Sequence, residues 1–280
     1  MRVPVLVSCM MLVLSACDKK EVDPTPDTAA MTQLNVPYGG DPKLKMDLYL
    51  PAGRSEDSTR VIILIHGGGW ADGDKADFTP YVTVLQQQFP DYAIFNINYR
   101  LAAPGVNLFP TQEGDVQFAI DYIYANRSTY KISGNFVFLG ASAGAHLALL
   151  QGYKHTSTVK PTAIIDLFGP TDLTSLYNSS PLAAIALTQL LATTPAASPG
   201  AYEQSSPLFF INSSSPPTLI FQGGRDQVVP PVQSEMLKAK LDTAGVPNQY
   251  VLYPTEAHGW EGANLADTFI KVAAFLRAHP

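Results

Sequence analysis

One serine lies in a pattern that favours nucleophilic chemistry. Ser142 is the central residue of Gly140-Ala141-Ser142-Ala143-Gly144, which has the form Gly-x-Ser-x-Gly. An apolar run precedes it and an alanine-rich segment follows, so the pattern predicts a strand, a sharp turn and a helix. Small flanking residues let the strand and helix approach closely, and the helix start offers N–H groups to an anion. We predict that Ser142 is a nucleophile, although the pentapeptide alone also fits an ordinary turn.

A run of glycines follows another apolar segment. Positions 66–70 read His-Gly-Gly-Gly-Trp, directly after the β-branched run at 61–65. Because glycine has no side chain, its backbone N–H groups can come close to a ligand. An oxyanion hole needs such donors, fixed where negative charge develops on the substrate. We predict that the backbone N–H groups of Gly68, Gly69 and Ala143 form this hole.

An acid and a base follow two later apolar runs. Asp226 and His258 come after Ser142 in the order serine, aspartate, histidine. In this arrangement His258 takes the Ser142 proton, and Asp226 fixes the imidazole tautomer and stabilises its charge. Asp172 also follows an expected strand end and is the alternative acid. The carboxylate that is not used would cap the next helix.

Elimination supports the choice of histidine. The chain contains five histidines. His66 belongs to the glycine motif, His146 lies one helical turn beyond the serine and would pack beneath the loop, and His155 follows the same helix on a surface segment. His279 is the penultimate residue. His258 is the histidine expected in a loop directly after a buried strand.

The expected strands and helices bring these side chains together. Amphipathic helical segments separate apolar, β-branched runs, which predicts a parallel sheet with helices on both faces. Functional residues of such sheets gather at the carboxyl ends of the strands. An alternating segment at 43–50 predicts the second arm of an antiparallel hairpin at the sheet edge. The apolar runs lie at 61–65, 92–97, 136–139, 163–167, 217–222 and 250–253.

Residues 173–215 interrupt this alternation. They are rich in serine, alanine, proline and leucine, with one expected helix over 181–193. We interpret the segment as an insertion that caps the site. Trp70 is a candidate wall of the substrate pocket, although a core position explains it equally well.

Composition limits the function classes. The chain has 280 residues, of which 46% are hydrophobic and 15% charged, enough for one large domain over residues 31–280. The net charge is −6 without a basic cluster, which argues against a nucleic-acid partner. The histidines are dispersed and the chain has two cysteines, so we expect no metal site and no cofactor.

The N-terminal stretch is typical of an exported protein. A short apolar stretch ends in Leu14-Ser15-Ala16-Cys17, which is similar to a bacterial lipobox. We expect a signal peptide over residues 1–16, lipid on Cys17, and a flexible tether over 17–30. The protein would then be anchored in the cell envelope through this lipid alone, with no cysteine left for a disulfide. An ordinary secretory signal is the alternative.

With these motifs together, the chain resembles the α/β-hydrolase carboxylesterases with His-Gly-Gly-Gly-Trp, a group that includes hormone-sensitive-lipase-like enzymes, small bacterial esterases and kynurenine formamidases. One departure is Ala145, where many relatives carry a second glycine after the elbow, so its methyl group is expected to narrow the pocket floor. The matching segments are HGGGWADGDK (66–75), NYRLA (98–102), GASAGAHLA (140–148), GPTDL (169–173), GGRDQVVP (223–230) and EAHGW (256–260).

The resemblance implies an α/β-hydrolase fold, with a mostly parallel sheet of about eight strands and a small helical cap. It implies a serine esterase for small to medium acyl esters, including acetyl or feruloyl esters of plant polysaccharide. The alternative is an amidase or peptidase with the same triad. Arg100 and Asp115 occupy recurring family positions that we interpret as a structural pair, and Asp72 and Lys75 as loop salt-bridge partners.

Overall fold

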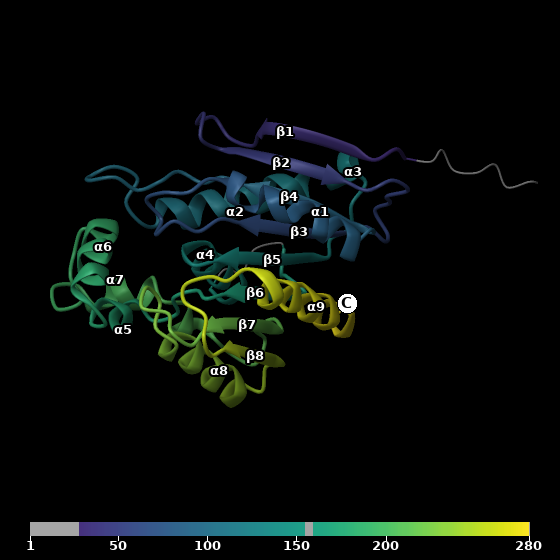
Figure 1. Ribbon diagram of the computed structural model, residues 1–280. Helices are drawn as coiled ribbons and strands as arrows, with labels where there is room; N and C mark the ends of the chain where they lie inside the picture. Colours follow the sequence, from purple (N-terminus) through teal and green to yellow (C-terminus); the bar gives the residue numbers. More distant parts are fainter. Residues whose placement is uncertain (1–27, 155–158, 280) are drawn as a thin grey trace, which may run out of the picture.

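A single mixed sheet organises the protein. The computed structural model describes residues 28–154 and 159–279, and within these ranges eight strands form one sheet in the order β1-β2-β4-β3-β5-β6-β7-β8 (Figure 1). Strand β2 pairs antiparallel with β1 and β4, and the remaining pairs are parallel. The strands are β1 (Met31–Pro37), β2 (Lys45–Leu50), β3 (Arg60–Ile65), β4 (Tyr92–Ile97), β5 (Phe136–Ala141), β6 (Ala163–Leu167), β7 (Thr218–Gly223) and β8 (Asn248–Tyr253).

Helices cover both faces of the sheet, and this arrangement confirms the expected α/β-hydrolase fold. The long helices occur where the apolar periodicity predicts them, and the short helices were not predicted. The described helices are η1 (Lys75–Phe78), α1 (Thr79–Gln88), α2 (Thr111–Ala125), α3 (Arg127–Tyr130), α4 (Ala143–Tyr153), α5 (Leu173–Tyr177), α6 (Pro181–Leu191), α7 (Pro199–Gln204), η2 (Pro207–Phe210), α8 (Val232–Ala244) and α9 (Gly262–Ala278).

The core has two layers because successive strand side chains point to opposite faces. Along β3, Ile63 and Ile65 join the cluster packed under α2, α4 and α8. Ile62 and Leu64 join the cluster packed under α1 and α9. A strand that is buried on both faces is therefore apolar at nearly every position, as β3 is.

The N-terminal hairpin differs from the expectation in one respect. The alternating strand β2 is an inner strand, and β1 is the edge. Asp47 on β2 is buried rather than exposed, because the Lys75 ammonium reaches its carboxylate at 2.9 Å. A buried ion pair thus lies at a position where the alternation of polar and apolar residues predicts a solvent-exposed side chain.

The segment 173–215, here called the cap segment, lies at the end of the sheet to which the parallel strands point (Figure 1). It contains three α-helices (α5, α6 and α7) and the short η2, where the sequence pattern indicates one helix. An aspartate caps α5 and a serine caps α6, since Asp172 accepts from Ser175 N and Ser180 accepts from Ala183 N. Short capped helices of this kind carry too little periodicity to be recognised from sequence.

Two expectations fall on residues outside the described ranges. The lipobox with Cys17 and nearly all of the expected tether lie in residues 1–27, and His155 lies in residues 155–158. Among the described helices, none combines the length and apolar character needed to cross a bilayer.

Candidate active site

The turn that carries Ser142 is sharply strained. Ser142 has φ 53° and ψ −122°, a conformation that costs an L-residue energy and exposes its side chain. The Ser142 N–H donates to Leu167 O on the neighbouring strand β6 at 2.8 Å. Close packing requires the flanking glycines, because a Cβ on Gly140 would lie 2.3 Å from Gly144 O and one on Gly144 2.0 Å from Ile65 O.

A continuous chain of hydrogen bonds joins the three predicted side chains. His258 Nε2 lies 2.9 Å from Ser142 Oγ, and His258 Nδ1 lies 2.7 Å from Asp226 Oδ2. Since an ionised carboxylate only accepts, Nδ1 carries the proton and Nε2 is left to accept from the serine hydroxyl. This tautomer is the one that can remove a proton from Ser142.

The Asp226 carboxylate is held from several directions. The backbone N–H groups of Val228 and Val229 donate to Oδ1 at 2.8 and 2.9 Å. Gln222 is fully buried and donates to Oδ2 at 3.3 Å, while its own carbonyl oxygen accepts from Ser234 at 2.7 Å. The roles of Gln222 and Ser234 were not predicted, because nothing in the sequence distinguishes a glutamine that supports a carboxylate from any other polar residue in a strand.

The alternative acid occupies a different place. Asp172 Oδ1 accepts from Ser175 N at 2.9 Å and caps α5. The backbone N–H of Asp172 donates to Gln233 Oε1 at 2.8 Å. The structure thus brings Asp226, and not Asp172, to the imidazole.

The glycine loop faces the serine with unpaired donors. The N–H groups of Gly68 and Gly69 bond to no residue that the structure describes. Ala143 is the first residue of α4, where a backbone N–H has no acceptor within the helix. Gly68 has φ +103°, and a Cβ there would lie 2.1 Å from Asp72 O, whereas the space around Gly69 is open. The loop can therefore accept an anion beside Ser142.

Buried rings hold this loop in place. The Tyr99 hydroxyl donates to His66 O at 3.0 Å, and its ring stacks on the His66 imidazole at 4.3 Å. Burial lowers the pKa of His66, so it stays neutral as part of this packing. Tyr99 thus supports the backbone at His66, directly before the glycines.

His146 connects the loop to the cap segment. Trp70 Nε1 donates to His146 Nδ1 at 3.2 Å, and His146 Nε2 donates to Ser205 O at 2.7 Å. His146 is fully buried, and this burial lowers its pKa to about 4. The ring packs beneath the loop, as expected, and its neutral tautomer satisfies both partners.

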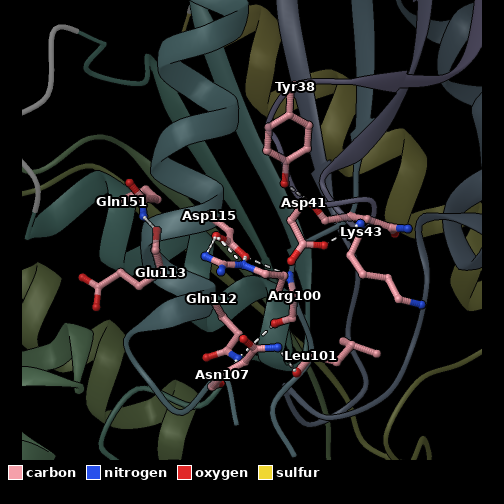
Figure 2. Close-up of polar contacts among 11 residues, drawn as sticks. Tyr38, Asp41, Lys43, Arg100, Leu101, Asn107, Gln112, Glu113, Asp115 and Gln151 are labelled. Atoms are coloured by element: carbon pink, nitrogen blue, oxygen red, sulfur yellow. Dashed lines mark hydrogen bonds and ion pairs between the residues drawn. The ribbon is translucent and has the colours of Figure 1, made fainter.

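A second polar network fixes the chain after β4 (Figure 2). The Arg100 guanidinium forms a two-pronged pair with Asp115, with Nη2 2.6 Å from Oδ1 and Nε 2.9 Å from Oδ2. Gln112 donates to Arg100 O at 3.0 Å and to Asn107 O at 2.7 Å. The structure confirms the predicted Arg100–Asp115 pair and places it behind the Trp70 loop, since Ala102 N donates to Trp70 O at 2.9 Å.

The expectations for three other side chains are resolved as follows. Lys75 forms the expected ion pair, with Asp47. Asp72 was expected in a salt bridge, but its carboxylate instead accepts from the backbone N–H of Gly73 at 2.8 Å. The Ala145 methyl does not narrow the pocket floor, because it is fully buried and points at Gly169, where a Cβ would lie 2.7 Å from it.

A cavity of about 520 Å³ lies over Ser142, here called the cap cavity. The glycine loop at 67–69, Ser142 and His258 line this cavity, together with side chains of α5 and α6. Trp70 lines the cavity while remaining 4% exposed, so it belongs to both the wall and the core. Most of the described side chains that line the cavity are apolar, and His258 contributes an imidazole.

Across residues 28–154 and 159–279, no group of three or more His, Cys, Asp or Glu side chains could hold a metal ion. A hydroxyl, an imidazole and a carboxylate in sequence, beside unpaired N–H groups, can carry out nucleophilic attack on a carbonyl.

The sheet order, the strained serine turn and the loops at the strand ends define the α/β-hydrolase fold. Within that class, the chain belongs to the BD-FAE family, whose model matches residues 46–241.

Curated relatives include two esterases of Mycobacterium tuberculosis. Esterase LipC is 26% identical over 259 residues, covering 85% of this chain and 63% of LipC. Esterase LipQ is 27% identical over 253 residues, covering 83% of this chain and 58% of LipQ. The chain thus spans less than two thirds of the length of either relative.

Solved structures support the same fold. A truncated form of a carbohydrate esterase from gut microbiota superposes with a TM-score of 0.75 at 24% identity, covering 90% of this chain and 99% of that one. A bifunctional GH43-CE protein of Bacteroides eggerthii has a TM-score of 0.74 at 26% identity. It covers 87% of this chain, which in turn spans 38% of that protein.

Proposed function

We propose that the protein is a serine carboxylic-ester hydrolase with Ser142, His258 and Asp226 as its catalytic triad. The single observation that carries the proposal is the hydrogen-bonded series from Ser142 Oγ through His258 to Asp226 Oδ2, which opens toward the unpaired N–H groups of Gly68 and Gly69. Esterases among the relatives support the same activity.

In the proposed mechanism, Ser142 Oγ attacks the ester carbonyl while its proton moves to His258 Nε2. The carbonyl oxygen becomes an oxyanion, which accepts from the N–H groups of Gly68, Gly69 and Ala143. The tetrahedral intermediate collapses, the imidazolium gives its proton to the alcohol oxygen, and an acyl-Ser142 remains. Water then attacks the acyl carbon with His258 again as base, which releases the acid and restores the serine.

For the substrate, we propose small to medium acyl esters, including acetyl or feruloyl esters on plant polysaccharide. Support comes from the carbohydrate esterase and the GH43-CE protein among the solved structures. The apolar cap cavity of about 520 Å³ suits an uncharged ester group. We also propose that the protein belongs to the hormone-sensitive-lipase-like branch of the fold, and the His-Gly-Gly-Gly-Trp sequence at 66–70 supports this.

Amide hydrolysis is the second candidate. A kynurenine formamidase of Meyerozyma guilliermondii is 28% identical, and this chain spans 85% of it. Two dipeptidyl peptidases also match, but this chain spans 32% and 31% of them. These relatives support amide hydrolysis, by a formamidase-like or a peptidase-like enzyme, as the competing activity.

A panel of substrates tests both candidates. Purified protein is assayed on p-nitrophenyl esters of increasing acyl length, acetylated xylan, a feruloylated arabinoside and N-formylkynurenine. We expect ester kcat/KM to exceed the amide value at least a hundredfold, and Ser142→Ala to abolish ester turnover. Equal or faster amide turnover would replace the ester assignment with the second candidate.

We also propose that the protein is exported and lipid-anchored through Cys17, on the strength of the lipobox-like sequence. The full chain would incorporate radiolabelled palmitate and fractionate with membranes when expressed in a bacterial host. A Cys17→Ala chain should lose the label. If the label persists in that variant, Cys17 is not the lipidation site.

A further inference from the structure

A second, smaller cavity lies on the other side of the serine turn, here called the rear cavity. It has a volume of about 210 Å³ and sits between the sheet and the helices α1 and α9. Apolar cavities of ~150 Å³ bind benzene, so this one has room for an aromatic ring with a short linker. The serine mechanism does not use it.

The walls of the rear cavity are aromatic and aliphatic. Phe78, Tyr81 and Phe269 come from η1, α1 and α9, and Trp260 comes from the loop after His258. Trp260 Nε1 already donates to Thr268 Oγ1 at 2.8 Å, so neither group needs a partner from a ligand. Among the described residues that line it, the charged side chain is the exposed Asp77, which would repel an anionic group.

The rear cavity begins one residue from the nucleophile. Gly67, Ala141 and Phe168 line both the rear cavity and the cap cavity. Ala141 directly precedes Ser142, and a Cβ on Gly67 would lie 3.3 Å from Ser142 Cβ. Atoms attached to the Ser142 oxygen therefore have a short path toward this space.

Phe168 is the side chain that divides the two cavities. Its ring packs edge-on against the His258 imidazole at 4.7 Å and against Trp260 at 5.2 Å. Phe168 also has φ +47°, which is uncommon for a bulky residue. The other two shared residues are a glycine and an alanine, so Phe168 contributes the large side chain among the described residues that both cavities share.

An ester has two ends, and each needs its own space. The cap cavity is the larger one, and its rim residues Leu182 and Val228 are 75% and 58% exposed, which leaves an exit for a bulky alcohol. We propose that the rear cavity is the acyl-binding subsite, that it takes an uncharged acyl group bearing an aromatic ring, and that Phe168 controls entry to it. This inference rests on the proposed ester hydrolase function and specifies its acyl side.

The test compares two esters with the same leaving group, p-nitrophenyl acetate and p-nitrophenyl 3-phenylpropanoate. The readout is the ratio of their kcat/KM values, phenylpropanoate over acetate, in each variant. Phe168→Ala removes the dividing ring and should raise the ratio about tenfold. Leu265→Trp fills the rear cavity from its half-buried rim and should lower the ratio about tenfold.

Two further variants control the experiment. Ile270→Trp adds the same bulk on the outer face of α9, where Ile270 is 61% exposed, and should leave the ratio within twofold. Ala186→Trp fills the cap cavity instead. If Leu265→Trp fails to fold, Val272→Phe, from the buried face of the same helix, fills the rear cavity in its place.

The outcomes separate the inference from the proposed function. A ratio that falls in Ala186→Trp but not in Leu265→Trp or Val272→Phe overturns the inference, because the acyl group then lies under the cap. A wild-type protein with no Ser142-dependent hydrolysis of p-nitrophenyl acetate overturns the proposed function itself. Opposite shifts in Phe168→Ala and Leu265→Trp are the result that the inference requires.

Discussion

The loops at the sheet end and the cap segment both enclose the space over Ser142, but they are built differently. Ser142, Gly68 and Asp226 are each fixed by backbone hydrogen bonds or by positions that admit no Cβ. The cap contributes mainly carbon surface, and its Leu182 and Ile185 are 75% and 57% exposed. We infer from this contrast that the sheet end carries out the proposed reaction and that the cap contacts the alcohol part of the ester. Variants at the sheet end should therefore lower kcat for every ester, and cap variants should change KM between esters.

The largest contrast is expected between two aspartates. Asp226→Asn leaves the shape intact but presents an amide to His258 Nδ1, so kcat should fall by on the order of 10³–10⁴. Asp172→Asn keeps the cap of α5, because asparagine also accepts from Ser175 N, and kcat should stay within about twofold. Steady-state kinetics on p-nitrophenyl acetate measure both. A larger loss in Asp172→Asn would reverse the assignment of the acid.

A second pair of variants tests the oxyanion loop. Gly68→Ala and Gly69→Ala both keep their N–H groups, but only the Gly68 Cβ would lie 2.1 Å from Asp72 O. Gly68→Ala must therefore move the loop, and kcat should fall by on the order of 10²–10³. In Gly69→Ala the only cost is the backbone strain of an alanine at φ +57°, so kcat should fall less than tenfold. Equal losses would mean that backbone position at Gly68 is not what the reaction depends on.

His146 joins the two regions, and its removal should have an intermediate effect. His146→Phe leaves Trp70 Nε1 and Ser205 O without their partner, which costs about 1–3 kcal/mol of unfolding free energy for each group. Loosening the loop should also lower kcat about tenfold. Urea unfolding and steady-state kinetics measure the two effects.

The same variant has a distinctive pH signature. The His146 pKa is about 4 in the folded protein and 6.5 in the unfolded chain, so the unfolded chain takes up the proton first as the pH falls. The stability that neutral His146 contributes is present above pH 6.5 and is lost as the pH falls toward 4. Wild type should lose about 2 kcal/mol more than His146→Phe between pH 7.5 and pH 5. Parallel losses would show that His146 titrates normally.

The smallest expected effect is on the cap. Leu182 lines the cap cavity but is 75% exposed, so Leu182→Ala removes little buried surface. KM for an acetate ester of a long-chain alcohol should rise two- to fivefold, with kcat unchanged. A fall in kcat for every ester would remove the distinction between the two regions.

The sheet end is also the region that could be predicted from the sequence. Buried parallel strands appear as continuous apolar runs, and the candidate catalytic residues follow directly after these runs. The strained turn at Ser142 was predictable from its glycines, since no other residue fits at 140 or 144.

What the sequence did not reveal depends on contacts between distant segments. Gln222 and Ser234 lie on β7 and α8, and only the folded chain places them behind Asp226. The sequence shows Phe168 only as an apolar residue at the end of a strand, and only the folded chain shows that it lines both cavities. The short helix α5 depends on one capping side chain, Asp172, and α5 packs against α6 and α7, which apolar periodicity does not reveal.

The nucleophile itself can be identified with a p-nitrophenyl alkylphosphonate, which forms a stable Oγ–phosphorus bond and releases p-nitrophenol. Peptide mass mapping should find one label per chain, on Ser142, with labelling and loss of esterase activity advancing together. Ser142→Ala should take no label and hydrolyse no p-nitrophenyl acetate, while Asp172→Asn labels at the wild-type rate. A label on another residue, or a Ser142→Ala protein with wild-type activity, would contradict the assignment of Ser142 as the nucleophile.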